Sequence, residues 1–295
     1  AAVQFQLGLT GTAAGTQYAD PINEKISYLS SSLLFYLHLS LFYTIINLSN
    51  KSIQENDKHR YEVINMLREI NLDEISDGRL YSSNDMAKTD CKGCDGCSAC
   101  CHGMGNSIVL DPLDVYRLST NLSKSVNELL TGPLELNVVD GIILPNLKMA
   151  RAEEACSFLD TNGRCTVHAF RPGICRMFPL GRFYENHSFQ YFLQVHECPK
   201  TDRSKVKIKK WLDTPNLKTY EKYIADWHFF LKGLQEYVMN LTSDSSSDSD
   251  STARTISMHV LTQFYLTPYG EDGNFYEEFY ERLEKSQLFT QSLGI

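Results

Sequence analysis

The chain has 295 residues, enough for one large or two modest domains, and its 42% hydrophobic and 22% charged residues are ordinary for a globular protein. A formal net charge of −8 argues against general nucleic-acid binding, so no nucleic acid is expected as a partner. All nine cysteines lie between Cys91 and Cys198, which is unlike a secreted disulfide framework and favours metal ligation. Because oxidised thiols do not ligate metals, a reducing, cytoplasmic location is expected.

The first 65 residues contain an apolar segment and no cysteine. Residues 26–50 carry no formal charge and are long enough to span a bilayer. They also carry many Ser, Thr, Asn and His side chains, a heavy polar load for lipid. A buried or partner-covered helix is therefore favoured over membrane contact, and residues 1–65 form a leader of unknown role.

Capping and turn patterns predict the secondary structure of the central region. Asp111 and Ser125 each precede a helix and are followed three residues later by a carboxylate, which is the pattern of a capping box. Hairpins are predicted over 134–144, turning at residues 140–141, over 156–168, turning at 162–163, and over 181–198, turning near Asn186. These elements predict an α+β fold.

The second half of the chain reads as one strand, two helices and a linker. Lysines alternate with Val206 and Ile208 over 204–211, which predicts a strand with a lysine face, either a solvated edge or a docking face for an anionic partner. Apolar residues at steps of three and four from Leu217 to Val238 predict a long helix. Residues 243–254, rich in Ser and Asp, predict a flexible linker, and 255–295 predict an amphipathic helical segment.

Five cysteines occupy residues 91–101, CKGCDGCSACC: Cys91, Cys94, Cys97, Cys100 and Cys101. Compact C-x-x-C runs of this kind hold iron–sulfur clusters, whereas zinc sites separate their C-x-x-C pairs by a dozen or more residues. The run therefore favours an iron–sulfur cluster, with zinc as the alternative. Because Cys100 and Cys101 are adjacent, we expect them to point in different directions, which implies two sites or one spare thiol.

Four further cysteines follow the run, at Cys156, Cys165, Cys175 and Cys198. Two sites with four ligands each would use eight of the nine thiols, so all nine are candidate ligands. Cys156 and Cys165 lie near opposite ends of a predicted hairpin, which would bring them together. His168 is a reserve ligand.

Every Lys or Arg between residues 151 and 182 is an arginine. Guanidinium groups donate fixed hydrogen bonds to anionic partners, and a thiolate-bound metal is anionic. Arg171 and Arg176 flank the turn from Pro172 to Cys175, so we expect these two to support the thiolates from outside the ligand set. Ordinary ion pairs with nearby carboxylates are the alternative.

The stretches CDGCSACC at 94–101 and CSFLDTNGRCTVHAFRPGICRMFPLGRF at 156–183 resemble the YkgJ-like cysteine-cluster family, which is described as zinc- or iron-chelating. The resemblance runs from about Met66 to the C-terminus and is closest to clostridial members. It implies metal ligands at seven positions, and Cys91 and Cys198 go beyond this minimal pattern. The seven are Cys94, Cys97, Cys100, Cys101, Cys156, Cys165 and Cys175.

The resemblance leaves several functions open, because relatives are labelled as iron–sulfur oxidoreductases or as flagellin lysine N-methylases. We expect an iron–sulfur protein of electron transfer or redox chemistry with an unidentified redox or protein partner, and an oxidoreductase if it is an enzyme. A zinc-binding structural or interaction module and a lysine methylase with a structural cluster are the alternatives. The expected fold is a small metal-organised centre of hairpins and loops within residues 66–242, wrapped by helices.

Overall fold

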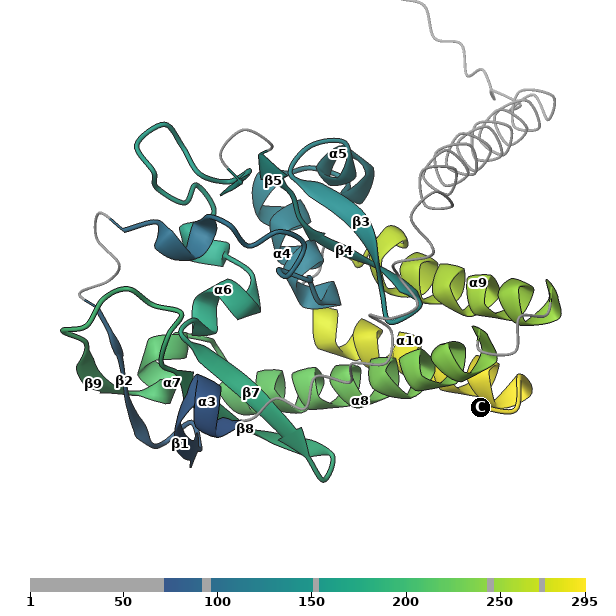
Figure 1. Cartoon of the computed structure of the whole chain (residues 1–295). Helices are drawn as coiled ribbons and strands as arrows, with labels where there is room; N and C mark the ends of the chain where they lie inside the picture. The colour runs from purple at the N-terminus through teal and green to yellow at the C-terminus, as the bar shows by residue number, and fades with distance from the viewer. Residues whose placement is uncertain (1–71, 92–96, 151–153, 243–246, 271–273) are drawn as a thin grey trace, which may run out of the picture. The chain divides into compact units, whose positions relative to one another are not determined.

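A computed structural model describes residues 72–295 apart from 92–96, 151–153, 243–246 and 271–273 (Figure 1). Its helices are α3 (Leu72–Ile75), α4 (Pro112–Leu122), α5 (Val126–Leu130), α6 (Gly173–Met177), α7 (Ile208–Leu212), α8 (Leu217–Thr242), α9 (Ser247–Leu261) and α10 (Phe275–Ser292). Two 3₁₀ turns, η1 (Ala99–Cys101) and η2 (His168–Phe170), and a π-helical turn, η3 (Thr262–Leu266), complete the helical elements.

The strands form small antiparallel sheets, so the α+β prediction is confirmed. They are β1 (Ser76–Tyr81), β2 (Met86–Asp90), β3 (Leu134–Val139), β4 (Ile142–Leu147), β5 (Met149–Ala150), β6 (Ala155–Cys156), β7 (Leu180–Glu185), β8 (Ser188–Gln194) and β9 (Ser204–Lys207). The described strands group as one sheet of order β1-β8-β7 and as the pairs β2-β9, β3-β4 and β5-β6.

Two of the predicted hairpins are confirmed, because their turn residues adopt the backbone that a tight hairpin needs. Asp140 and Gly141 join β3 to β4 with φ of 48° and 83°. Asn186 and His187 join β7 to β8 with φ of 52° and 56°. Positive φ at both central residues matches the right-handed twist of the flanking strands, and Asn, Asp and Gly tolerate it best.

The hairpin predicted over 156–168 is wrong in extent. Cys156 pairs with Met149, and within the loop a single bridge joins Leu159 to Cys165. The Asp160 carboxylate accepts hydrogen bonds of 2.8 Å from the backbone N–H groups of Asn162 and Arg164. These side-chain bonds close a tight turn, while backbone bonds from Thr166 N–H to the Phe158 carbonyl and from Asp160 N–H to the Arg164 carbonyl, both 2.9 Å, cross the short loop.

The predicted helix starts and the long apolar stripe are confirmed. Both capping boxes form, at Asp111 with Asp114 and at Ser125 with Glu128. The apolar stripe of α8 packs in the main core with residues of α4, β3, β4, α9, η3 and α10. Figure 1 shows α8 below the β3-β4 hairpin, and α9 contacts both α8 and β4. A second, smaller core lies between the β1-β8-β7 sheet and α7.

Two predictions for the second half of the chain need correction. The Ser/Asp-rich stretch is helical from Ser247, where α9 begins, so the linker predicted over 243–254 does not extend through that range. Asp248 and Asp250 stand in the first turn of α9, where acidic side chains favour a helix, and Ala253 and Ile256 are buried in the main core. The lysine strand ends at Lys207, and α7 begins at Ile208.

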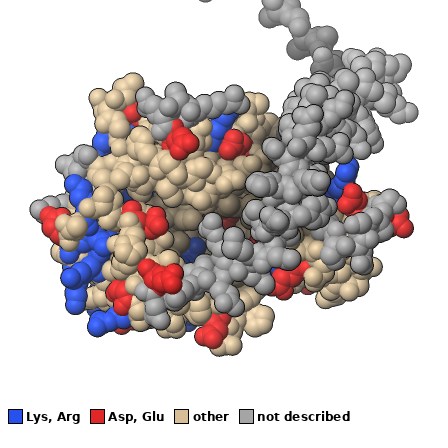
Figure 2. Space-filling view, in the orientation of Figure 1, with Lys and Arg blue, Asp and Glu red and all other residues tan. Residues whose placement is uncertain are grey.

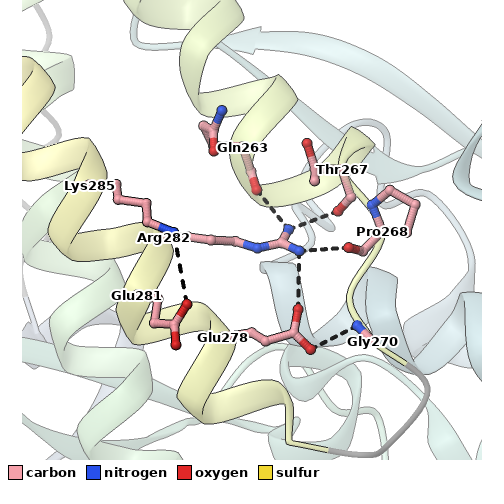
Figure 3. A network of polar contacts seen from close by, with 8 residues as sticks. All are labelled: Gln263, Thr267, Pro268, Gly270, Glu278, Glu281, Arg282 and Lys285. Carbon is pink, nitrogen blue, oxygen red and sulfur yellow. Dashed lines mark hydrogen bonds and ion pairs between the residues drawn. The ribbon is translucent and has the colours of Figure 1, made fainter.

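A buried arginine holds the C-terminal helix against the turn that follows η3 (Figure 3). Arg282 Nη1 donates to the carbonyls of Gln263 and Thr267, both at 2.8 Å, and Nη2 donates to the carbonyl of Pro268 at 2.6 Å. The guanidinium also lies 3.7 Å from the centre of the Tyr269 ring. One side chain on α10 thus satisfies three backbone carbonyls at the end of a helix.

None of the helices in the described ranges is long and apolar enough to cross a membrane. The apolar segment 26–50 and the rest of the leader lie outside the described residues.

Candidate metal centre

The two halves of the cysteine set lie on short elements that the backbone brings together. Cys100 and Cys101 belong to η1, and Cys97 precedes it, while Cys94 lies outside the described residues. His102 forms a bridge with Ala155, and the Gly103 N–H donates to the carbonyl of Glu154 at 2.9 Å. The end of the dense run therefore lies beside the strand that carries Cys156.

The short helix α6, which carries Cys175, is fixed by a buried carboxylate. Asp114 on α4 is 3% exposed, and its Oδ1 accepts a hydrogen bond of 2.8 Å from the Gly173 N–H. A Cβ at Gly173 would lie 2.2 Å from the Tyr220 hydroxyl oxygen, so only glycine fits between α4 and α8. Asp114 and Tyr220 thus position Cys175, a role that the sequence showed only as helix capping and core packing.

Five thiols lie close enough to influence one another's ionisation, and we call them the thiol cluster: Cys100, Cys101, Cys156, Cys165 and Cys175. Burial raises the pKa of the Cys175 thiol, and the charges of Asp114 and of three other cluster cysteines raise it further. Burial, with the charges of Cys165 and Cys100, likewise raises the pKa of Cys156. A cation would relieve this crowding of potential negative charge.

Adjacent Cys100 and Cys101 share a hydrogen bond, so the expectation that they diverge is wrong. The hydrogen bond from Cys101 lowers the pKa of Cys100 to about 7, although burial opposes it. The same bond raises the pKa of Cys101, as do burial and the charges of nearby cluster cysteines. The two sulfurs are close enough to share this bond, which removes the reason to treat one of them as spare.

Backbone amides also point at the cluster sulfurs. The N–H of Phe158 donates to the Cys156 sulfur, and the N–H of Val167 donates to the Cys165 sulfur. In each case the donor lies two residues after the cysteine, and its bond lowers a thiol pKa that burial raises. Amide bonds of this kind stabilise thiolates and tune metal–sulfur centres.

The two predicted supporting arginines occupy different environments. The hydrogen bond from Cys101 dominates the pKa of Cys100, and burial dominates that of Cys165, but the charge of Arg171 lowers both. Arg171 Nη1 also lies 2.7 Å from His168 Nε2. Arg176 Nη2 instead donates to the Ala169 carbonyl at 2.8 Å. Arg171 therefore acts electrostatically on the thiols, whereas Arg176 ties η2 to α6.

The cluster thiols are neighbours, but they do not form a completed metal-coordination site in the structure. Within the described ranges, no three Cys, His, Asp or Glu side chains converge closely enough to hold a metal ion. Thiolates are nevertheless ligands for both iron and zinc, so the donor chemistry of the thiol cluster suits either metal. The described cysteines of the two halves that form no disulfide include Cys97, Cys100, Cys101, Cys156, Cys165, Cys175 and Cys198.

Cys91 and Cys198 lie at the ends of segments joined by the β2-β9 pair. β2 leads directly into Cys91, and Cys198 precedes β9, where Ser204 Oγ donates to Asp90 Oδ2 at 3.1 Å. Exposed lysines cover this pair and α7, and Figure 2 shows the blue side chains at the left of the view. Lys88 lies directly opposite Lys205, and such like charges discourage further strands from pairing with this edge.

Comparison with known proteins finds a similarity in the central segment. Residues 93–205 match the CxxCxxCC family model, described as "Putative zinc- or iron-chelating domain". The matched span includes eight of the nine cysteines, all except Cys91. No curated protein and no solved structure matches the chain.

Proposed function

We propose that the chain is an iron–sulfur protein of electron transfer or redox chemistry, because residues 93–205 match a family model described as zinc- or iron-chelating. The observation that carries the proposal is the thiol cluster, in which adjacent cysteines of the dense run lie beside three cysteines from 55 to 75 residues later. Iron–sulfur clusters commonly take closely spaced cysteines from one run and a further cysteine from a distant segment.

The proposed ligands are the nine cysteines, with the thiol cluster at the centre of the set. Cys101, Cys156, Cys165 and Cys175 supply four thiols, and Cys100 adds a fifth whose pKa of about 7 favours the thiolate. Cys91, Cys94, Cys97 and Cys198 would complete this centre or a second one. Bound as a cluster, iron and sulfide would supply one-electron chemistry, while the amides at Phe158 and Val167 and the charge of Arg171 would tune its potential.

Zinc is the second candidate, and one observation favours it. Four thiols from Cys101, Cys156, Cys165 and Cys175 would satisfy a tetrahedral structural zinc ion. The segments that carry them are short turns and loops, which gain stability when a metal joins them. In that case the chain would be a structural or interaction module and not a redox protein.

Elemental and visible analysis of the full chain, purified without oxygen, separates the two proposals. We expect a brown protein with iron and acid-labile sulfide. Colourless protein with stoichiometric zinc and no iron would contradict the iron–sulfur assignment and leave metal binding intact. Rapid alkylation of the same sample should find the cysteines reduced, in keeping with the proposed cytoplasmic location.

A further inference from the structure

A cavity of about 290 Å³ lies between α4, α6, β7 and α8. Its size is near the lower end for small-molecule pockets, which begin at about 300 Å³. Tyr184, Trp227 and His228 supply an aromatic wall, and the rings of Tyr184 and His228 stack at 3.5 Å between centroids. Ile174 and Met177 of α6 close another side, so the helix that carries Cys175 forms part of the cavity.

Two groups of opposite charge line the cavity without meeting. Asp111 Oδ1 accepts hydrogen bonds from the Asp114 N–H at 2.9 Å and from the Tyr223 hydroxyl at 3.0 Å. Arg182 Nη2 donates to the Tyr220 hydroxyl at 2.9 Å. Its Nε is buried and has no hydrogen-bond partner in the described part of the chain. No ion pair between described residues joins Arg182 to either aspartate.

The two aspartates do not share the negative charge equally. Burial raises the pKa of Asp114, and the charge of Asp111 raises it well beyond the usual range. Burial also raises the pKa of Asp111, but hydrogen bonds from Asp114 and Tyr223 and the charge of Arg182 act in the opposite direction. Asp111 is thus the carboxyl whose negative charge is supported by the Tyr223 hydroxyl and by the charge of Arg182. Burial lowers the pKa of His228 to about 4, so this ring is neutral at pH 7.

We propose that this cavity binds a small molecule carrying both an ammonium and a carboxylate group, as a free α-amino acid with an apolar side chain does. The ammonium would pair with Asp111, and the carboxylate would accept hydrogen bonds from the Arg182 guanidinium. Each of these two charged groups would then gain an oppositely charged partner, which buried ions favour. The apolar side chain would lie against Trp227 and Leu231. The proposal is independent of which metal the thiol cluster holds.

Calorimetric titration of the purified, metal-loaded full chain with L-phenylalanine and L-leucine tests the proposal. Two analogues of the first probe each lack one charge: 3-phenylpropionate has no ammonium, and 2-phenylethylamine has no carboxylate. We expect the amino acids to bind and both analogues to bind at least about tenfold more weakly. Absence of binding by both amino acids up to about 10 mM would overturn the proposal.

Two variants assign the charges. Asp111→Asn keeps an oxygen that can cap α4 and accept from Tyr223, but it removes the negative charge. It should weaken the binding of L-phenylalanine by about tenfold or more and leave the affinity for 3-phenylpropionate unchanged. Arg182→Gln should weaken the binding of L-phenylalanine and of 3-phenylpropionate, which both carry a carboxylate, and leave the affinity for 2-phenylethylamine unchanged. Equal effects of each variant on all three probes would contradict the proposed orientation.

A third variant keeps both charges and fills the space. Leu231 is partly buried at the cavity wall, so Leu231→Trp should abolish L-phenylalanine binding while metal content and helical circular dichroism stay unchanged. Gly233→Ala is the matched control, because a Cβ there meets no atom within 4 Å. Unchanged affinity in Leu231→Trp would place the binding elsewhere and overturn the proposal.

Discussion

Removing the metal should lower the thermal unfolding temperature of the full chain by about 10 °C or more. The thiol cluster joins η1, the 156–165 loop and α6, which are short elements with few strand or helix hydrogen bonds of their own. Because a centre shared by these segments exists only in the folded chain, its binding free energy stabilises the fold. A contribution of about 4 kcal/mol corresponds to a shift of about 8–16 °C in a domain of this size.

The measurement is a melting curve of the loaded chain and of chain from which elemental analysis shows all metal has been removed. Cys175→Ser is the control: it should melt near the stripped wild type and respond little to further chelation. Hydrogen exchange should show the loss of protection over residues 155–177, with α8 less affected because it lies in the main core. An unchanged melting temperature after complete metal removal would contradict the structural role of the centre.

Replacing Arg282 by leucine should cost about 3 kcal/mol of unfolding free energy. Arg282 is only 9% exposed, and loss of its guanidinium leaves the carbonyls of Gln263, Thr267 and Pro268 without their charged donor. Such carbonyls are costly because water reaches them poorly. The unfolding free energy of Arg282→Lys should lie between those of the wild type and Arg282→Leu, since one ammonium cannot replace the planar guanidinium fork.

Denaturant unfolding of both Arg282 variants beside Lys285→Ala gives the comparison. Lys285 stands on the same helix, and its 3.9 Å pair with Glu281 is largely exposed (Figure 3). Exposed pairs of this kind contribute little, so Lys285→Ala should unfold like the wild type. Equal stability of Arg282→Leu and Lys285→Ala would show that the Arg282 contacts do not hold α10 in place.

Local chemistry explains which elements the sequence reveals. The turns at Asp140-Gly141 and at Asn186 are read correctly because few residues tolerate positive φ. Capping boxes are equally local, since the side chain of Asp111 or Ser125 meets a backbone N–H three residues later. The long stripe of α8 is visible because its spacing alone defines one buried face.

The elements that the sequence misses depend on contacts from elsewhere in the fold. The polar composition of 243–252 concealed the start of α9, whose buried residues Ala253 and Ile256 follow only later in the chain. Asp160 closes the 156–168 loop with its side chain, which strand periodicity does not register. The contact of Asp114 with Gly173 has no sequence pattern, because α4 and α6 meet only after folding. The same holds for Asp111 and Arg182, which line one cavity although they lie far apart in the sequence.

For the candidate site, the spacing of cysteines indicated ligands and a link between the two halves of the set. The structure adds which thiols are neighbours, and it reverses the expectation for Cys100 and Cys101, whose tight turn is not evident from adjacency. The different environments of Arg171 and Arg176 also depend on tertiary structure. Both flank the turn from Pro172 to Cys175, and nothing in the sequence tells an electrostatic neighbour of the thiols from an arginine that binds a backbone carbonyl.

The central claim is that one metal centre takes ligands from both the dense run and the later segment. Metal content per chain in Cys101→Ser and Cys175→Ser, each purified without oxygen beside the wild type, tests this claim most directly. Ile174→Val changes the same short helix without altering a thiol and should keep all the metal. We predict that both cysteine variants lose metal from the shared centre. Full metal content in Cys175→Ser, with loss in Cys101→Ser alone, would contradict the shared centre.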